Sequence, residues 1–171
     1  MDLRSLFETL LYILPAMTAN GSPVVASRFY GKGTPIDGGR SLGGKRLLGD
    51  GKTWEGLATG TIVGLLTGII IGVLLDRPVA YWASIGALSG FGAMLGDIVG
   101  SFIKRRLGLP RGSPAPLLDQ LDFYVGALVV LYFVGVRLSL SSVIIWAVII
   151  FFLHRATNYL AYKLKLKSVP H

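Results

Sequence analysis

Three aspartates lie within stretches of the chain that are otherwise apolar enough to form membrane helices: Asp97, Asp119 and Asp122. A charge buried in a membrane is costly unless a cation or a water-filled cavity receives it, so these carboxylates are the first candidates for a functional site. Asp119 and Asp122 are three residues apart, which places them on adjacent turns of one helix face, where their like charges repel. A divalent cation relieves that repulsion, and Mg²⁺ is the usual choice where triphosphates supply further ligands. The pattern predicts a magnesium site that Asp97 completes from a neighbouring helix.

Two simpler explanations are open for the same residues. Pro116 is well placed to begin a helix, so Asp119 and Asp122 would lie near its positive end, where acids are favourable. Asp97 lies seven residues before Lys104 and could pair with a neighbouring lysine or arginine. We favour the metal site because acids inside a membrane protein commonly have a function.

A long glycine-rich loop covers residues 20–53, and its end leads into the second span as Gly49-Asp50-Gly51-Lys52-Thr53-Trp54-Glu55-Gly56. Glycine lets backbone amides approach an oxyanion, and Lys45, Arg46 and Lys52 carry charges that could neutralise one. The pattern is not a Walker A sequence, so by itself it does not specify phosphate. An equally good interpretation is a juxtamembrane loop whose basic residues contact anionic lipid head groups.

Composition places the chain among integral membrane proteins. Of its 171 residues, 52% are hydrophobic and 15% are charged, and the mean hydropathy is +0.62. A soluble domain of this length could not bury so much apolar surface. The chain has no cysteine, which excludes disulfides and thiolate metal sites.

Five apolar runs predict an all-α, polytopic membrane protein with a single integral membrane domain over residues 1–171, because each run is near the roughly 20 residues needed to cross hydrocarbon. The predicted transmembrane spans are 3–19, 54–75, 79–103, 116–136 and 139–160, with cytoplasmic loops at 20–53 and 104–115. Most of the 17 Lys and Arg residues fall in these loops and in the carboxyl-terminal tail. The positive-inside rule then places the N-terminus outside and the C-terminus in the cytoplasm. Topology thus accounts for most of the net charge of +8, which argues against nucleic acid as a partner.

The first span is the shortest and contains Glu8 and Pro15, so a signal peptide cleaved near residues 16–19 is an alternative. Cleavage would put the most basic loop on the wrong side of the membrane unless the remaining topology inverted. We therefore interpret the first span as a membrane helix.

Glycine recurs at every fourth position of the second span, from Gly56 to Gly72, and the third span repeats the spacing with Gly92, Gly96 and Gly100. Residues four apart share one helix face, so each run forms a smooth ridge that lets another helix approach closely. We expect the second and third spans to pack together. A groove for a lipid chain is the less favoured interpretation.

Two motifs resemble those of a known family. Residues 45–56 (KRLLGDGKTWEG) and residues 114–122 (PAPLLDQLD) together resemble the archaeal CDP-archaeol synthases, and the resemblance extends over nearly the whole chain and its five-span plan. Ser101, the Lys104-Arg105 pair and the two later aspartates are similar to the carboxyl-terminal signature of the wider CDP-diacylglycerol synthase family.

One departure separates the chain from the bacterial members of that wider family. Their signature has a Pro-Gly-His-Gly-Gly stretch and an Asp-Arg pair, where this chain has Gly112-Ser113-Pro114-Ala115-Pro116 and Asp119-Gln120. No role of the missing groups can be transferred, and the difference favours the archaeal branch.

The resemblance implies Mg²⁺-dependent transfer of CMP from CTP to an unsaturated digeranylgeranyl glycerol phosphate, giving a CDP-activated lipid and pyrophosphate on the cytoplasmic side of the cell membrane. In that reaction we expect Mg²⁺ to be held by Asp97, Asp119 and Asp122. The residues expected to hold the triphosphate or the lipid phosphate are Lys45, Lys52, Ser101, Lys104 and Arg105, with Lys52 and Lys104 the strongest candidates. Arg46, Arg106 and Arg111 are expected to anchor lipid head groups.

Other functions would use the same residues. A CTP-dependent polyprenol kinase would need a similar pocket but would release CDP instead of pyrophosphate. A CDP-alcohol phosphotransferase fits less well, because Phe123-Tyr124 interrupt its aspartate motif. A small cation channel or transporter could use the three aspartates as an ion path, but conduction would require further acids toward the outer face, so we favour a blind cavity.

A polar stripe near the inner end of the fifth span is formed by His154, Asn158 and Tyr162, which follow each other at four-residue spacing. The stripe could line the cavity. Anchoring at the membrane interface, with Arg155 snorkelling beside it, is the favoured interpretation.

Overall fold

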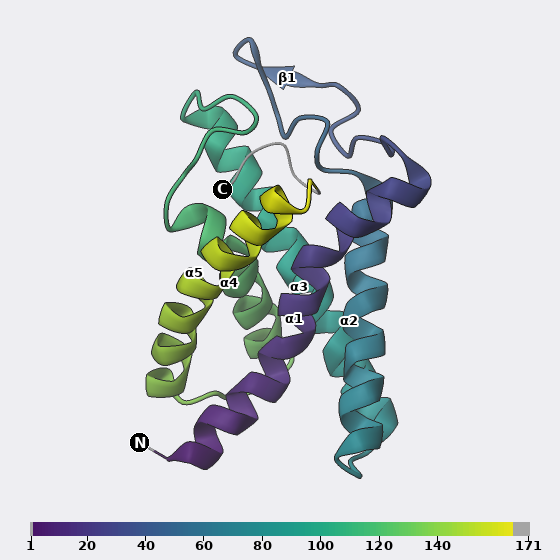
Figure 1. The fold of residues 1–171 in the computed structure, drawn as a ribbon, viewed down its shortest axis with the longest axis vertical. Helices are drawn as coiled ribbons and strands as arrows, with labels where there is room; N and C mark the ends of the chain where they lie inside the picture. The colour runs from purple at the N-terminus through teal and green to yellow at the C-terminus, as the bar shows by residue number, and fades with distance from the viewer. Residues whose placement is uncertain (1, 166–171) are drawn as a thin grey trace.

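Five helices and one short hairpin make up the part of the chain that the computed structural model describes, residues 2–165. In chain order the elements are α1 (Leu3–Tyr30), β1 (Ser41–Leu42), β2 (Lys45–Arg46), α2 (Trp54–Leu74), α3 (Val79–Arg106), α4 (Leu118–Phe133) and α5 (Leu140–Lys163). Figure 1 shows the helices forming a bundle, with the hairpin and the loop between α3 and α4 at one end. The predicted helical class is confirmed.

Three of the described helices are long and apolar enough to cross a membrane: Trp54–Leu74, Val79–Arg106 and Leu140–Leu160. Large apolar side chains of α2, such as Ile62, Leu66 and Ile70, are at least half exposed on the outside of the bundle. Such a surface suits lipid, and the chain is a membrane protein.

The first helix is longer than predicted. It continues eleven residues past the predicted end at 19, through Pro23, which cannot donate to the carbonyl of Ala19. The hydroxyl of Ser22 donates to that same carbonyl oxygen at 2.8 Å and replaces the missing backbone bond. The proline therefore does not end the helix, and the predicted loop 20–53 is shortened at its start.

The remaining loop also contains structure that the sequence does not predict. β1 and β2 pair antiparallel, joined by Gly43 and Gly44, which both have positive φ as a tight hairpin turn requires. Strands of two residues are too short to show the alternation of apolar and polar side chains by which a strand is recognised in a sequence. The ends of α2, α3, α4 and α5 lie within three residues of the predicted spans.

The glycine ridges pack as close contacts, although not all with the expected partner. A Cβ atom on Gly64 of α2 would lie 2.5 Å from the carbonyl oxygen of Gly86 and 2.8 Å from Cα of Gly90, both on α3. The prediction that the second and third spans pack together is confirmed, but the second ridge meets a different helix, because Gly92 and the two glycines that follow it at four-residue spacing face α4. A Cβ on Gly92 would lie 2.8 Å from the carbonyl oxygen of Gly126. α3 therefore packs closely against α2 with one face and against α4 with another.

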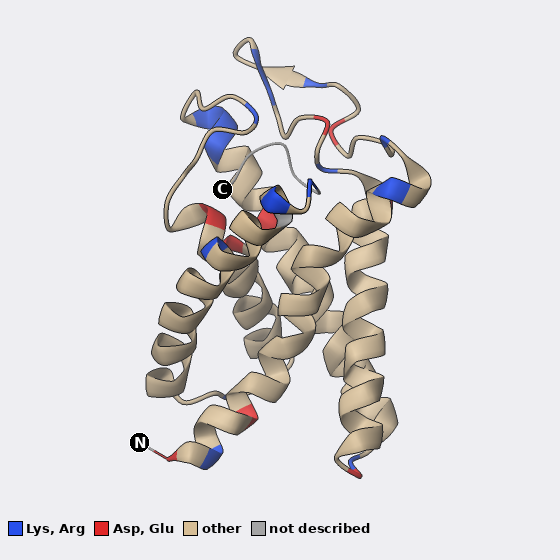
Figure 2. Ribbon diagram, in the orientation of Figure 1, with Lys and Arg blue, Asp and Glu red and all other residues tan. Residues whose placement is uncertain are grey.

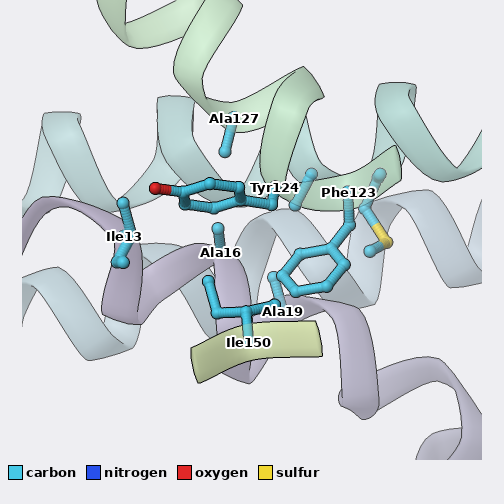
Figure 3. Packing of buried hydrophobic residues seen from close by; sticks show 9 residues of the cluster. Ile13, Ala16, Ala19, Phe123, Tyr124, Ala127 and Ile150 are labelled. Carbon is cyan, nitrogen blue, oxygen red and sulfur yellow. The ribbon is translucent and has the colours of Figure 1, made fainter. Parts of the chain in front are cut away.

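Aromatic residues of α4 fill the core between α1 and α5. Figure 3 shows the ring of Tyr124 beside Ile13 and Ala16 of α1, and the ring of Phe123 beside Ile150 of α5. The buried Tyr124 hydroxyl donates to the carbonyl oxygen of Val143 at 2.9 Å, which satisfies its polar end. This packing fixes the turn of α4 that carries Asp122.

Candidate active site

A cavity of about 480 Å³ lies among α1, α3, α4, α5 and the two loops that join α1 to α2 and α3 to α4. Figure 2 shows that lysines and arginines gather at this loop end of the bundle, whereas the opposite end has few charged residues. The charged residues in the wall are Lys52, Asp97, Lys104, Asp119 and Asp122. All three predicted aspartates and the two strongest lysine candidates therefore share one cavity.

Asp97 comes from α3 and pairs with Lys52, whose Nζ donates to Asp97 Oδ2. Both side chains are largely buried. Lys52 stands directly before Thr53, which begins α2 by accepting from the backbone N–H of Gly56 at 3.1 Å. The start of α2 thereby directs the preceding lysine toward α3.

Asp119 lies in the first turn of α4 and uses both of its oxygens. Lys104 Nζ of α3 donates to Oδ1 at 2.6 Å, and the backbone N–H of Ala115 donates to Oδ2 at 2.7 Å. The second bond holds Ala115, just before α4, against the first turn of the helix. Asp119 therefore both lines the cavity and stabilises the start of α4. This is the helix-start position that the sequence left open as an alternative.

Asp122 lies one turn further along α4 and forms no ion pair with any residue between 2 and 165. Its Oδ1 accepts from the N–H of Phe123 at 2.7 Å. Its other side packs on Gly100 of α3, where an added Cβ would lie 3.0 Å from the Asp122 Cγ. Because the glycine leaves room for it, the carboxylate sits directly between the two helices.

The donor set suits a hard divalent cation. Three carboxylates from two packed helices line one cavity, and the negative charges of Asp97 and Asp122 are near enough to oppose each other. Within the described residues, no three acid or histidine side chains already form a metal-binding cluster. The two lysines form ion pairs with Asp97 and Asp119 instead, and among the described residues no ion pair reaches Asp122.

The other predicted phosphate-binding residues lie outside the cavity wall. Lys45 is in the exposed hairpin, and Ser101 is buried within α3 at 4% exposure. Arg105 donates to the carbonyl oxygen of Leu109 and so closes the end of α3. None of these three residues lines the cavity that holds the carboxylates.

Two of the three arginines predicted to anchor head groups, Arg46 and Arg106, bind residues of the loop between α1 and α2. Arg46 contacts Asp37 through Nη2 at 2.8 Å and Nε at 3.2 Å, and the Arg46 guanidinium holds the pKa of Asp37 well below its usual range. Arg106 donates to backbone carbonyl oxygens of the hairpin. Arg111 packs beside Gly51, 3.5 Å from where a Cβ would stand.

Residues of α1 and α5, which lie outside the two matched motifs, complete the cavity. His154 and Asn158 are in the wall, together with Asn20 of α1. His154 Nδ1 lies 3.4 Å from the carbonyl oxygen of Gln120, next to Asp119. Two of the three members of the polar stripe on α5 thus line the cavity, the less favoured interpretation. Tyr162, the third member of the stripe, is 42% exposed and lies outside the cavity wall.

A helical membrane fold with acids and lysines gathered in a cavity at its basic end defines an intramembrane enzyme with a charged site. The family model described as CarS-like, CDP-archaeol synthase, matches residues 2–171. The chain belongs to this family.

Individual relatives agree over nearly the full length. The CDP-archaeol synthase of Hyperthermus butylicus is 51% identical over 164 residues, covering 95% of each chain. That of Sulfolobus acidocaldarius is 49% identical over 167 residues, covering 94% of this chain and 95% of its own. A solved structure of an intramembrane enzyme for archaeal membrane lipids biosynthesis matches with a TM-score of 0.82 and 44% identity, covering 90% of this chain and 94% of the other.

Proposed function

We propose that the protein is a Mg²⁺-dependent cytidylyltransferase that transfers CMP from CTP to an isoprenoid ether-lipid phosphate. The products would be unsaturated CDP-archaeol and pyrophosphate. Membership of the CDP-archaeol synthase family makes the chain a nucleotidyltransferase of membrane lipid biosynthesis. The observation that carries the proposal is the single cavity in which two lysines and three aspartates from α3, α4 and the loop before α2 meet.

The proposed topology is multi-pass, with five spans, the N-terminus outside and the cavity facing the cytoplasm. Three helices meet the length and hydropathy of a span, and α1 and α4 pack beside them in the same bundle. The gathering of basic residues at the loop end supports a cytoplasmic orientation of that end (Figure 2). CTP would then enter from the cytoplasm, directly onto Lys52 and Lys104.

The chemistry needs positioning more than proton transfer. A lipid phosphate is already an anionic nucleophile near neutral pH, so its oxygen can form a bond to the α-phosphorus of CTP while the bond to the pyrophosphate oxygen breaks. The barrier is largely charge repulsion between the two anions. Lys52 and Lys104 would neutralise phosphate oxygens from partly buried positions, where such contacts are stronger than in bulk water.

Asp97, Asp119 and Asp122 would hold Mg²⁺, since carboxylate oxygens are its preferred protein ligands. When bound at these carboxylates, the ion would supply positive charge that stabilises the negative charge developing in the transition state. Asp122 is the residue most available for this role, because no lysine among the described residues forms an ion pair with it.

The apolar part of the cavity wall suits the lipid. Val24 and Val25 of α1 and Ile150 and Leu153 of α5 line the same cavity as the charged residues. An isoprenoid glycerol phosphate could place its phosphate among the lysines while its chains lie along these side chains. Surrounding membrane lipids would contact the outer faces of the bundle.

Incubation of the purified protein with labelled CTP, Mg²⁺ and candidate lipid phosphates tests the proposal. We expect pyrophosphate and a CDP-lipid in equal amounts, dependent on both the cation and the isoprenoid lipid phosphate. In parallel reactions with the free lipid alcohols in place of their phosphates, formation of CDP and a phosphorylated lipid would instead support a CTP-dependent polyprenol kinase. Production of neither with any lipid would contradict both.

A further inference from the structure

Asp37, in the loop between α1 and α2, is a buried acid for which the sequence predicts no role. Its side chain is 0% exposed and accepts five hydrogen bonds. Two come from the guanidinium of Arg46, and the others come from the backbone N–H groups of Gly39, Leu48 and Gly49 at 3.0 Å each. Such a carboxylate organises the chain around it, because each of these donors would otherwise need another partner.

The loop segment that Asp37 holds leads directly to Lys52. The carbonyl oxygen of Gly49 accepts from the backbone N–H of Lys52 at 3.3 Å, and the carbonyl oxygen of Lys52 accepts from the N–H of Ile36 at 2.8 Å. Both backbone groups of Lys52 are therefore bonded to residues that are held by Asp37 or precede it. From this fixed backbone the Lys52 side chain reaches Asp97 in the cavity.

A second set of contacts fixes the same loop to α3. Arg106 donates to the carbonyl oxygens of Leu42, Lys45 and Arg46 at 2.7, 3.0 and 2.8 Å. Arg106 ends α3, the helix that also carries Asp97. The hairpin is thus tied to the helix that bears the partner of Lys52, and the two arginines are used inside the protein instead of on lipid head groups.

We propose that Asp37 is a positioning residue, whose contact with Arg46 and with the amides of Leu48 and Gly49 forms a clamp that places Lys52 in the cavity. The clamp is a property of the loop alone. Its consequence for the reaction rests on the function proposed above, in which Lys52 contacts a phosphate of CTP. Because that contact is made both before and during the reaction, its loss should act mainly on the KM for CTP.

Replacement of Asp37 by alanine tests the clamp with two independent readouts. In hydrogen–deuterium exchange without substrates, we expect faster exchange at Ile36, Lys52 and Trp54, whose amides do not touch Asp37. In the activity assay, we expect a rise of about tenfold in the KM for CTP with a smaller fall in kcat, as for loss of one charge-assisted contact.

The matched control is Asp50→Ala. Asp50 contacts the same Arg46 guanidinium at 2.8 Å, but its side chain is 63% exposed and it does not hold the backbone. We expect the KM to stay within about twofold and the exchange at Lys52 to be unchanged, because exposed ion pairs contribute little. Arg46→Lys, which keeps the charge but loses the two-pronged contact, should give an intermediate effect and serves if Asp37→Ala does not fold.

The clamp would be overturned if Asp37→Ala left both the exchange at Lys52 and the KM for CTP unchanged. The same result in Arg46→Lys would overturn it where that variant takes the place of Asp37→Ala. Equal effects of Asp37→Ala and Asp50→Ala would do the same. The exchange experiment needs no substrate, so it separates this inference from the proposed function. If the wild-type protein formed no CDP-lipid, the function would fail while the exchange data would still decide the role of Asp37.

Discussion

Lys104 Nζ lies 2.6 Å from Asp119 Oδ1, so a lysine expected to hold phosphate is bonded to a carboxylate expected to hold a cation. Lys52 and Asp97 form a second pair of the same kind. In each pair the lysine neutralises an acid that would otherwise be costly to bury. When a nucleotide and a divalent cation enter, each lysine would exchange its carboxylate for phosphate oxygens, and each carboxylate would be left to the cation.

This exchange predicts opposite effects of one substitution on two ligands. Lys104→Met removes the ammonium that competes for Asp119, so Mn²⁺, used as a paramagnetic probe for the Mg²⁺ site, should bind several-fold more tightly in the absence of nucleotide. CTP should bind about tenfold more weakly, because a charge-assisted contact to phosphate is lost. Electron paramagnetic resonance of free Mn²⁺ and calorimetry with CTP measure the two affinities. Lys104→Arg is the control that keeps the charge, and weaker Mn²⁺ binding in Lys104→Met would contradict the exchange.

Asp122→Asn should abolish turnover without unfolding the protein. The amide keeps the shape that packs on Gly100 but loses the negative charge that makes the side chain a metal ligand. We expect a loss of about 10³-fold or more in kcat/KM, comparable with removal of a principal electrostatic contribution. The melting temperature in detergent should not fall, because an unpaired buried charge is removed.

The control for that variant is Glu8→Gln at the other end of the bundle. Glu8 is paired with Arg4 on the surface at 3.2 Å and lies outside the cavity wall, so activity should be unchanged. Wild-type turnover in Asp122→Asn would remove Asp122 from the metal site.

Gly64→Ala should destabilise the bundle. The added methyl group would lie 2.5 Å from the carbonyl oxygen of Gly86, and a backbone atom cannot move aside without separating α2 from α3. Overpacking of this kind costs about 1–3 kcal/mol, which lowers the melting temperature by several degrees in a chain of this size. Gly21→Ala is the matched control, because a Cβ there meets nothing within 4 Å and alanine favours a helix. Equal melting temperatures for the two variants would contradict the close packing of α2 on α3.

The positions of α2, α3 and α5 were predictable from the sequence because their apolar runs have the length and hydropathy of a membrane span. The end of α1 was not, because Pro23 normally interrupts a helix and its compensation by the Ser22 hydroxyl exists only once the helix has formed. The partner of the second glycine ridge was also not predictable. Spacing shows that Gly92 and Gly96 share a face, but it does not show which helix that face meets.

The carboxylates of the site were predictable for a similar reason, since an acid in an apolar run stands out. Asp37 was not, because an acid in a polar, glycine-rich loop usually lies in water. Its burial depends on a hairpin whose strands have two residues each, too few to show a pattern. Lys45 and Arg105 show the opposite case: both belong to the matched motifs, yet they lie outside the cavity wall.

The order of the loop should depend on pH through Asp37. Arg46 and the backbone amides of Gly49, Leu48 and Gly39 hold the pKa of Asp37 below its usual value, so the folded loop favours the charged carboxylate. A group whose pKa is depressed by folding contributes stability that is fully present above its unfolded pKa, about 4 for aspartate, and that is lost as the pH falls toward the folded pKa. The clamp should therefore be intact at neutral pH and weaken only below about pH 4. A nitroxide on Ser41→Cys, in a chain that has no other cysteine, should show constant mobility from neutral pH to that point and rising mobility below it. With Asp37→Asn the label should be more mobile at neutral pH and respond little to acid, and a transition near pH 6 in the unsubstituted loop would assign the titration to another group.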